Sequence, residues 1–401
     1  MSQSFSPTAM YAGSTTSQDW RRMPKYVGHL LETLGSGRVP LTIHSGEGAL
    51  LFDANGKEYW DFYGGHAVTL LGQGHPKLVE AIATQARQLT FMTTLADVPV
   101  RTKAAHALCA FTGMPVAWFV NSGAEANEAA LKIARKVTGR PVVIAMEHGF
   151  HGRTMGALGV TWGYRDQHAP AHGEVRFVPF GDLAALEAAL DERVAAVITE
   201  PVQGIAGIVE PPAGWLAAVH ERVHANGSVL ICDEVQSGIG RAGHPLLSKV
   251  MGVDADLVTV GKGVGGGFPV AALLLSAELA STVKPGEHGT TFGGGPLACA
   301  AVSATLEAIV EEGLLDKAKA LEQALKARLG AIRGVEQVRG AGVWIGVVLD
   351  RPAKPVAAAL LERRFLVGTA SDPAVLRLCP PAVTPLYAVE ALGAALAEVL
   401  A

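Results

Sequence analysis

Short apolar runs and longer amphipathic stretches alternate along the middle of the chain, from about residue 115 to residue 276. A strand that is apolar at every position is buried on both faces, and strands separated by helical stretches are joined by crossovers. The pattern therefore predicts an α/β fold with a mostly parallel sheet covered by helices. The predicted strands are Val116–Val120, Val142–Met146, Ala195–Thr199, Val229–Cys232, Leu257–Val260 and Val270–Leu275.

The region before this block has a different pattern. Residues 1–20 are polar and rich in Ser and Thr, which predicts a flexible arm. Gly48–Tyr63 alternates like a pair of strands around the turn Ala54–Lys57, and Pro76–Leu89 has the periodicity of an amphipathic helix. These features predict an N-terminal segment over residues 21–75 that precedes the large domain.

The region after the block is mainly helical in pattern. From Leu297 onwards helical periodicity dominates, with one strand-like apolar run from Val343 to Leu349. We therefore expect a large domain over residues 76–300. A smaller α+β domain is expected from residues 301–401 together with the N-terminal segment.

Composition narrows the class of protein. Of 401 residues, 49% are hydrophobic and 17% are charged, which is typical of a folded enzyme and not of a disordered chain. The net charge is only −4, with no run of basic residues, so neither nucleic acid nor an anionic membrane is expected as a partner. Four cysteines lie far apart without a Cys-x-x-Cys pair, which argues against a zinc site or a disulfide framework. We expect a soluble, cytoplasmic protein.

Chemically useful residues follow the predicted strands. In an open parallel sheet, ligands bind at the carboxyl ends of the strands, so the residues directly after each run are candidates for a site. They include one lysine, several carboxylates, an aromatic residue and a helix that begins after glycine. In order, these residues are Asn121–Gly123, Glu147–Phe150, Glu200–Pro201, Asp233–Glu234 and Gly261–Gly263.

The first of these sites opens an Ala-rich helix that continues to Arg135. Ser122 and Glu125 have the spacing of a capping box, with Gly123 between them. Because the first N–H groups of a helix have no partner within the helix, this position can bind phosphate. The simpler alternative is an ordinary capped helix without a ligand.

Lys262 is a candidate nucleophile. It follows a buried strand and precedes several glycines, so it does not lie on a solvated face. Desolvation lowers the pKa of a lysine and makes its neutral amine reactive toward an aldehyde, which is the basis of Schiff-base catalysis. Asp233, at another strand end, requires a cationic partner such as a pyridinium nitrogen. The alternative is a lysine that reaches solvent from a turn.

Two other motifs suggest different chemistry. Gly261–Gly266 matches the dinucleotide pattern G-x-G-x-x-G, but another strand follows where that motif requires a helix. His220 and His224 form an H-E-x-x-H sequence, which in a zinc hydrolase supplies two metal ligands. The apolar stripe of the same helix places both histidines toward solvent, so we interpret it as an amphipathic surface helix. A zinc hydrolase is kept as the alternative outside the main interpretation, and no metal is expected.

Taken together, several stretches resemble the class III aminotransferases of fold type I, a group that includes acetylornithine, ornithine and 4-aminobutyrate aminotransferases. The resemblance covers nearly the whole chain, and its stretches are specific only in combination. They are Asn121–Lys132, Gly149–Thr154, Glu200–Gly204, Asp233–Gly238, Gly261–Gly267, His288–Gly294 and Arg377–Pro381.

The resemblance implies pyridoxal 5′-phosphate as the cofactor, held as a Schiff base on Lys262. It further implies that Asp233 pairs with the pyridine nitrogen and that the backbone of Gly123 and Ala124 holds the phosphate. The remaining cofactor contacts implied by motif position are Phe150 stacked on the ring, Val235 beneath it, Gln236 at the ring hydroxyl, and Thr291 at the phosphate of the neighbouring subunit.

For the substrate, the resemblance implies binding by Arg153, Thr290 and Arg377, with Glu200 and Gln203 as further possible site residues. The two arginines match carboxylate-binding residues of the family, and a guanidinium binds a carboxylate through two parallel hydrogen bonds. In the ornithine-type enzymes a glutamate two residues after this glutamine screens the second arginine. Here that position is Ile205.

The resulting expectation is a homodimeric ω-aminotransferase with shared active sites. It would transfer a terminal amino group from an N-acylated ornithine- or lysine-type donor to 2-oxoglutarate in a ping-pong mechanism, within amino-acid biosynthesis. The alternative, suggested by Ile205, is a polyamine, 4-aminobutyrate or other ω-amine transaminase with a different donor.

Overall fold

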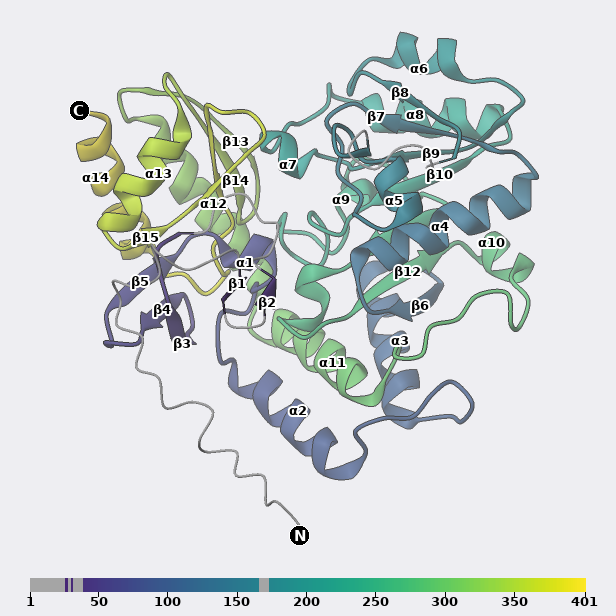
Figure 1. The fold of residues 1–401 in the computed structure, drawn as a ribbon, viewed down its shortest axis with the longest axis horizontal. Coiled ribbons are helices and arrows are strands. Elements are labelled where there is room, and N and C mark those ends of the chain that lie inside the picture. Colours follow the sequence, from purple (N-terminus) through teal and green to yellow (C-terminus); the bar gives the residue numbers. More distant parts are fainter. Residues whose placement is uncertain (1–25, 28–29, 32–38, 166–172) are drawn as a thin grey trace. The chain divides into compact units, whose positions relative to one another are not determined.

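The computed structural model describes residues 26–27, 30–31, 39–165 and 173–401, so the predicted flexible arm, residues 1–20, lies outside the described residues. The chain divides into two units, residues 1–41 and 42–401. In the first unit, β1 (Tyr26–Val27) and β2 (Leu30–Leu31) pair antiparallel. All elements discussed below belong to the second unit (Figure 1).

A seven-stranded sheet lies at the centre of the second unit. Its order is β6-β12-β11-β10-β9-β7-β8, and every neighbouring pair is parallel except those that include β12. The six predicted strands are all present, and the mostly parallel sheet is confirmed. The strands are β6 (Val116–Val120), β7 (Val142–Met146), β8 (Val175–Val178), β9 (Val194–Thr199), β10 (Val229–Asp233), β11 (Leu257–Val260) and β12 (Ala271–Leu275).

Two details of this sheet differ from the sequence pattern. Strand β12 runs antiparallel to both of its neighbours, because the connection from β11 contains only a short 3-10 turn, Lys262–Gly265, and no crossover helix. Strand β8 was not predicted, since its four residues include the polar Arg176 and lie at the edge of the sheet.

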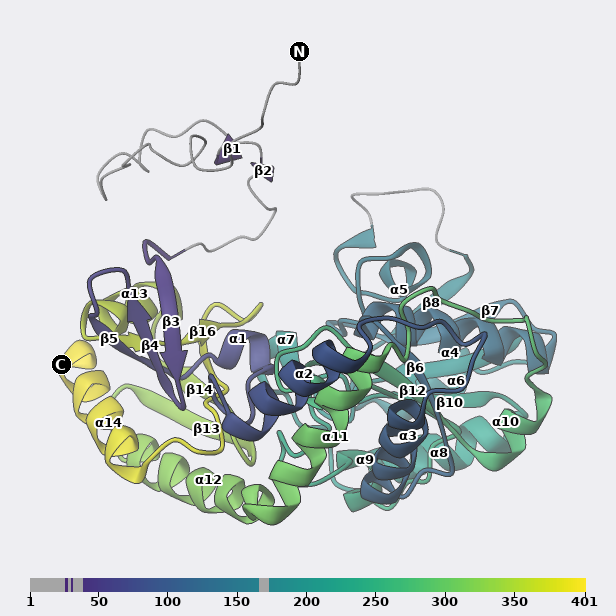
Figure 2. The same cartoon turned by 90° about the horizontal axis from the view of Figure 1, so that it is seen from below.

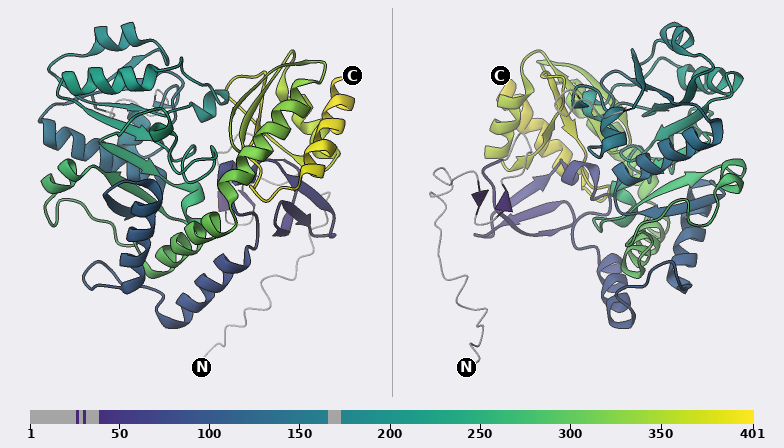
Figure 3. Two further views of the ribbon diagram at one scale, coloured as in Figure 1. Left: turned by 180° about the vertical axis from the view of Figure 1, so that it is seen from behind. Right: turned by 45° about the vertical axis from the view of Figure 1, so that its right-hand side comes forward.

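Different helices cover the two faces of the sheet, because successive strand residues point to opposite sides (Figure 3). Ile231 of β10 packs in a cluster with α4 (Gly123–Thr138). Its neighbours Leu230 and Cys232 pack on the other face, in a cluster that includes α8 (Trp215–Ala225). The sheet is therefore buried on both faces, as the continuous apolar runs predict.

The other helices lie around these sheets. Figure 2 shows α2 beside α11, and this pair makes extensive contact. The helices are α1 (Gly64–Ala67), α2 (Pro76–Gln88), α3 (Pro99–Thr112), α5 (Met155–Gly159), α6 (Leu183–Ala189), α7 (Gly204–Gly207), α9 (Leu247–Val250), α10 (Ala277–Thr282), α11 (Pro296–Glu311), α12 (Leu314–Gly330), α13 (Ala353–Glu362) and α14 (Leu386–Leu400).

The region after residue 330 contains more strand than the sequence pattern predicts. One sheet has the order β13-β14-β17-β16, and a second joins β15 in parallel to β5 of the N-terminal segment. The predicted strand pair around Ala54–Lys57 is present as β4 and β5. These strands are β3 (Ile43–Glu47), β4 (Leu50–Asp53), β5 (Glu58–Asp61), β13 (Val335–Ala341), β14 (Trp344–Leu349), β15 (Phe365–Leu366), β16 (Gly368–Thr369) and β17 (Val375–Leu378).

The proposed domain boundaries at residues 75 and 300 stay predictions. Helix α11 runs across residue 300 and contacts both α2 and α3.

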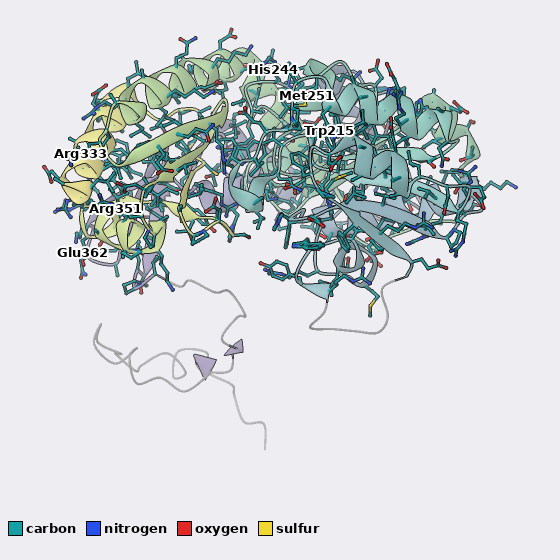
Figure 4. The ribbon with its side chains drawn as sticks, turned by 90° about the horizontal axis from the view of Figure 1, so that it is seen from above. Trp215, His244, Met251, Arg333, Arg351 and Glu362 are labelled. Atoms are coloured by element: carbon teal, nitrogen blue, oxygen red, sulfur yellow. The ribbon has the colours of Figure 1, made fainter. Side chains whose placement is uncertain are left out.

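Figure 4 places Arg351 and Glu362 with the C-terminal elements and Trp215 beside the large sheet. Trp215 makes an edge contact with Phe180, with ring centroids 4.9 Å apart.

Two observations concern membrane-spanning helices and the state of the cysteines. Among the described helices, none combines the length and apolar character needed to cross a membrane. All four cysteines are free thiols, and three of them are buried.

Glu234 holds the end of β10 against α9. Its side chain is fully buried, and burial raises the pKa of its carboxyl group. One oxygen accepts hydrogen bonds from Leu247 N at 2.7 Å and Ser237 Oγ at 3.0 Å, and the other accepts from the N–H and hydroxyl of Ser248 at 2.8 and 2.6 Å. This carboxyl group therefore organises the loop that follows Asp233.

We expect Glu234→Ala to lower the free energy of unfolding by about 2–4 kcal/mol, because several buried donors lose their acceptor. Urea denaturation followed by circular dichroism measures the change. Glu221→Ala, at an exposed position on α8, is the control and should change stability by less than about 0.5 kcal/mol. Equal stability of the two variants would show that Glu234 does not brace this loop.

Candidate active site

A cavity of about 360 Å³ lies at the carboxyl ends of the central strands. This is the edge of a parallel sheet at which ligands are expected to bind. Eight of the predicted site residues line it together: Gly123, Ala124, Phe150, Glu200, Asp233, Val235, Gln236 and Lys262. Thr290, Thr291, Arg153, Arg377 and Gln203 are not part of the lining.

Lys262 reaches this cavity from the turn after β11. Its backbone φ is +45°, a left-handed conformation that is uncommon for a residue with a side chain and often occurs at functional sites. Burial lowers the pKa of its amine, whereas the nearby carboxylates of Asp233 and Glu200 act in the opposite direction. The net lowering favours the neutral amine, which is the nucleophilic form.

Asp233 lies at the end of β10 and is almost fully buried. Its Oδ2 accepts hydrogen bonds of 2.8 Å from both His151 Nδ1 and Asn127 Nδ2, and its Oδ1 accepts one of 3.0 Å from the N–H of Val235. Burial by itself raises the pKa of this carboxyl, but the hydrogen bond and charge of His151 and the other donors lower it below its usual value. The group therefore stays ionised and can pair with a cationic ring nitrogen.

The sequence analysis missed three residues that hold Asp233. Besides its bond to Asp233, Asn127 Nδ2 donates to the carbonyl of His151 at 2.7 Å, and its Oδ1 accepts from Thr259 Oγ1 at 2.9 Å. Asn127 and His151 lie inside stretches that carry the family resemblance, so their type and position were visible. Their contact with Asp233 could not be seen in the sequence, because it joins α4, β10 and the loop after β7.

The start of α4 forms one end of the cavity. Ser122 Oγ accepts from the N–H of Glu125 at 3.3 Å, as the capping box predicts. The reverse bond differs from the motif, since Glu125 Oε2 accepts from the N–H of Asn121 at 2.7 Å and not from Ser122. The N–H groups of Gly123 and Ala124 have no acceptor among the described residues. They are therefore free to bind an anion.

Val235 and Phe150 line the middle of the cavity. A Cβ atom added at Gly123 would lie 2.6 Å from Val235, so this close approach requires glycine. One added at Gly261 would make a tight contact of 3.2 Å with the same side chain. The N–H of Phe150 donates to Glu200 Oε1 at 3.0 Å, which fixes the loop that carries the ring. Apolar groups of this kind are suited to contact a flat ring.

Glu200, Gln203 and Gln236 act mainly as links between loops. Glu200 is buried, which raises its pKa, and its second oxygen accepts from the N–H of Gly204 at 2.9 Å. Gln203 donates to the carbonyl of Glu147 at 2.7 Å. Gln236 Oε1 accepts from the indole N–H of Trp344 at 3.2 Å, while its side chain lines the cavity. A contact of Gln236 with the cofactor hydroxyl stays a prediction.

The two candidate carboxylate-binding arginines have different surroundings. Arg153 is exposed, with its guanidinium 5.6 Å from the ring centre of Phe150 and 5.4 Å from that of Tyr164. Arg377 of β17 is buried and donates to the carbonyls of Thr369 at 2.8 Å and Gly204 at 3.5 Å. Neither forms an ion pair within the part of the chain that the structure describes.

Thr290 and Thr291 lie on the loop before α11. Thr290 Oγ1 accepts from Asn121 Nδ2 at 3.0 Å, which ties this loop to the start of α4. Thr291 is exposed and does not line the cavity of its own chain. Its predicted role at the phosphate of a neighbouring subunit stays a prediction.

The histidines of the alternative zinc site lie on α8, apart from the cavity. His224 is exposed and forms a 2.9 Å contact with Asp256, and the rings of His220 and His224 are 4.1 Å apart. Within residues 39–165 and 173–401, no group of three or more His, Cys, Asp or Glu side chains is arranged to hold a metal ion. A third protein ligand, which catalytic zinc sites have, is not found among these residues.

The residues of the cavity fit pyridoxal phosphate. The free N–H groups at the start of α4 suit its phosphate, and the apolar side chains of Val235 and Phe150 in the cavity lining suit a flat ring. The ionised Asp233 suits a protonated pyridine nitrogen, and the amine of Lys262 suits an aldehyde.

Comparison with known proteins identifies the same chemistry. A family model described as aminotransferase class-III matches residues 33–400. The acetylornithine aminotransferase of Streptomyces coelicolor is 45% identical to this chain over 364 residues and is covered to 89%, as is this chain. The acetylornithine aminotransferase of Mycolicibacterium smegmatis is 43% identical over 371 residues, which cover 91% of this chain and 94% of the relative. The structure of ornithine aminotransferase from Toxoplasma gondii superposes with a TM-score of 0.88 at 30% identity, covering 96% of this chain and 94% of the other.

These matches confirm the resemblance and the fold type I architecture predicted from the sequence, and they do not favour a zinc hydrolase. The cofactor of such enzymes is pyridoxal phosphate, in agreement with the residues of the cavity. The chain belongs to the class-III aminotransferase family.

Proposed function

We propose that this aminotransferase takes the terminal amino group of an N-acylated ornithine- or lysine-type donor and passes it to 2-oxoglutarate in a ping-pong mechanism. The observation that carries the proposal is the shared cavity of Lys262 and Asp233 beside the free helix N-terminus at Gly123. The donor class is supported by the acetylornithine aminotransferases that align over about nine-tenths of the chain.

In this proposal, different residues of the cavity hold the cofactor, transfer the proton and keep the ring nitrogen charged. When bound, pyridoxal phosphate supplies an electron-withdrawing ring that accepts the electrons of a substrate carbon as its proton leaves. Lys262 would hold the cofactor, and its free Nζ would accept and return that proton. Asp233 would keep the ring nitrogen protonated, and the N–H groups of Gly123 and Ala124 would bind the phosphate.

The substrate carboxylates are assigned to Arg153 and Arg377. Arg377 supports this best, because its guanidinium is buried without an ion pair among the described residues, and a buried charge is favourable only with a partner. Ile205 lines the cavity where the ornithine-type enzymes carry the screening glutamate. The second candidate, a transaminase for other ω-amines, is favoured by this apolar residue.

We also propose a homodimer in the cytoplasm. Three exposed apolar residues are Phe91, Leu95 and Phe292, and the last of them directly follows Thr291 in the sequence. The rings of Phe91 and Phe292 are 5.3 Å apart, so the two loops that carry these residues meet in one patch. Arg101 holds the patch together by donating to the carbonyls of Met92, Thr93 and Gly294. Leu95 is 93% exposed, which favours burial against another subunit. The free thiols of all four cysteines agree with a reducing compartment.

Lys262→Ala should abolish the visible absorption of the lysine-bound cofactor and lower turnover by at least about 10³-fold, because one change removes both the attachment point and the base. Absorption spectra and single-turnover kinetics with N-acetylornithine measure the two effects. Lys249→Ala, a lysine that donates to the carbonyl of Gly113, is the control. Retained absorption in the Lys262 variant would refute the assignment.

Ile205→Glu tests the donor preference. A carboxylate at this position should pair with Arg377 and raise the ratio of kcat/KM for ω- over α-amino donors by about tenfold, equivalent to about 1.4 kcal/mol. Ile205→Gln separates the effect of charge from that of size. If the ratio is unchanged with Glu, the missing glutamate does not determine the choice of amino group.

Phe292→Asp tests the dimer. A charge in the apolar patch should raise the dissociation constant of the dimer by about 30-fold or more, measured by sedimentation at several concentrations. Leu386→Asp, at an exposed apolar position on α14, should leave it unchanged. A wild-type protein that sediments as a monomer would overturn the proposal directly.

A further inference from the structure

The side chain of Gln236 brings an amide group to the cavity lining, which also contains Asp233 and Lys262. The two ends of such an amide have opposite character, because its oxygen only accepts hydrogen bonds and its nitrogen only donates them. The two ends have nearly the same size and shape, so packing alone does not determine which of them faces a ligand. The hydrogen-bond partners of the amide determine it.

Trp344 of β14 fixes which end of Gln236 faces the cavity. Its indole N–H donates to Gln236 Oε1, with 3.2 Å between the nitrogen and the oxygen. An indole can donate a hydrogen bond but cannot accept one. The reversed amide would therefore place two N–H groups against each other. The oxygen of Gln236 is held toward Trp344, and Nε2 is the end that is left for the cavity.

The nitrogen of Gln236 is available to a ligand. Nε2 has no acceptor among the residues that the structure describes. It is not fully enclosed by protein, in contrast to the unpartnered indole nitrogens of Trp118 and Trp215. Since Gln236 is only 8% exposed and lines the cavity, the open space that Nε2 borders is the cavity. This wall of the cavity therefore offers a hydrogen-bond donor.

The packing around Trp344 keeps its indole in place. The side chain is 1% exposed and belongs to a buried cluster with Val202, Ile208 and Cys379. Interiors packed in this way leave little space for a large ring to change rotamer. A ring that is locked by packing can hold a neighbouring polar group in one orientation before any ligand binds.

Gly204 lies on a further side of the same amide. A Cβ atom added at Gly204 would collide with Gln236 Oε1 and would lie 3.0 Å from the indole ring of Trp344. The N–H of Gly204 donates to Glu200 Oε2 at 2.9 Å, which holds this backbone in position. The amide oxygen is therefore packed between the indole and the backbone, and turning the amide would require one of them to move.

We propose that Trp344 is a positioning residue that holds the amide of Gln236 with its N–H groups toward the cavity, where they stabilise negative charge on the ring oxygen of the cofactor. A hydrogen bond donated to a charged oxygen is stronger than one donated to a neutral oxygen. The inference uses the predicted contact of Gln236 with the cofactor hydroxyl and adds what orients it. It does not involve the amino donor or the acceptor, so it goes beyond the proposed function.

The test is the visible absorption spectrum of the holoenzyme as a function of pH, without substrate. The ring oxygen and the Schiff-base nitrogen share a proton, and the loss of this proton at high pH leaves the oxygen negative. A donor stabilises the deprotonated form and so lowers the pKa of this proton. Trp344→Phe removes the indole N–H and keeps an apolar ring. We expect it to raise the pKa by about half a unit to one unit. An unchanged pKa would overturn the proposal.

Trp215→Phe is the matched control. It also removes a buried indole N–H, but Trp215 has no hydrogen-bond partner among the described residues and does not line the cavity. We expect the pKa of the cofactor proton to stay at its wild-type value in this variant. Neither variant changes the titratable side chains of the cavity lining, which are His151, Glu200, Asp233 and Lys262.

A double-mutant cycle shows whether Trp344 acts through the amide. Gln236→Met keeps the length of the side chain and removes the amide, so it should raise the pKa by about one unit. Trp344→Phe should add no further shift in this background. If Trp344→Phe shifts the pKa equally with and without the amide, the tryptophan acts by another route and the proposal is wrong.

Gly204→Ala disturbs the amide without changing the indole. The added methyl group displaces Gln236 Oε1 and should shift the pKa in the same direction as Trp344→Phe. A Gly204→Ala enzyme that titrates like wild type would show that the orientation of the amide does not control the cofactor proton.

Failure of this inference can be told apart from failure of the proposed function. Turnover of N-acetylornithine by the wild-type enzyme tests the proposed function without reference to Trp344. If the wild-type enzyme shows this turnover and Trp344→Phe titrates like wild type, the proposed function stands and only the role of Trp344 is wrong.

Discussion

The active site depends on the buried carboxylate of Asp233. An ionised carboxylate in the interior is strongly unfavourable unless hydrogen bonds and positive charge compensate for lost water. Here His151, Asn127 and the N–H of Val235 supply the donors, and Thr259 orients the asparagine. These groups come from α4, β11 and the loops after β7 and β10, so the charge can be held only after these strands have come together in the sheet.

The same desolvation acts on Lys262 with the opposite result. Burial disfavours charge on both groups, but Asp233 accepts three hydrogen bonds that keep it ionised, whereas burial lowers the pKa of the lysine in spite of the nearby carboxylates. One cavity therefore holds an anion and an amine that is shifted toward its neutral form. Opposed environments of this kind assign acid and base roles to neighbouring groups.

Charge is distributed unevenly around the cavity, and this organises the rest of the site. One end of the cavity offers the free N–H groups at Gly123 and Ala124. The buried guanidinium of Arg377 lies outside the lining and donates to the carbonyl of Gly204, next to Ile205. Both regions suit anionic groups, although they arise from different parts of the fold. Ile205 lines the cavity and brings no charge to it.

Periodicity was sufficient to place β6, β7 and β11 at their observed residues, and the capping pattern predicted the start of α4, because these signals depend on neighbours in the sequence. The short strands β15 and β16 have no comparable signal, since two residues show no period and exist only through pairing with distant strands. The reversed direction of β12 was likewise not visible in its apolar pattern.

The sequence by itself determined the fold class, the family and the chemical types available at the strand ends, including Lys262 and Asp233. Only the tertiary structure decided which side chains share the cavity and which, like Gln203, hold a loop instead. The reason is that hydrogen bonds such as that between His151 and Asp233, 82 residues apart, and the burial that shifts pKa values exist only after distant strands have paired.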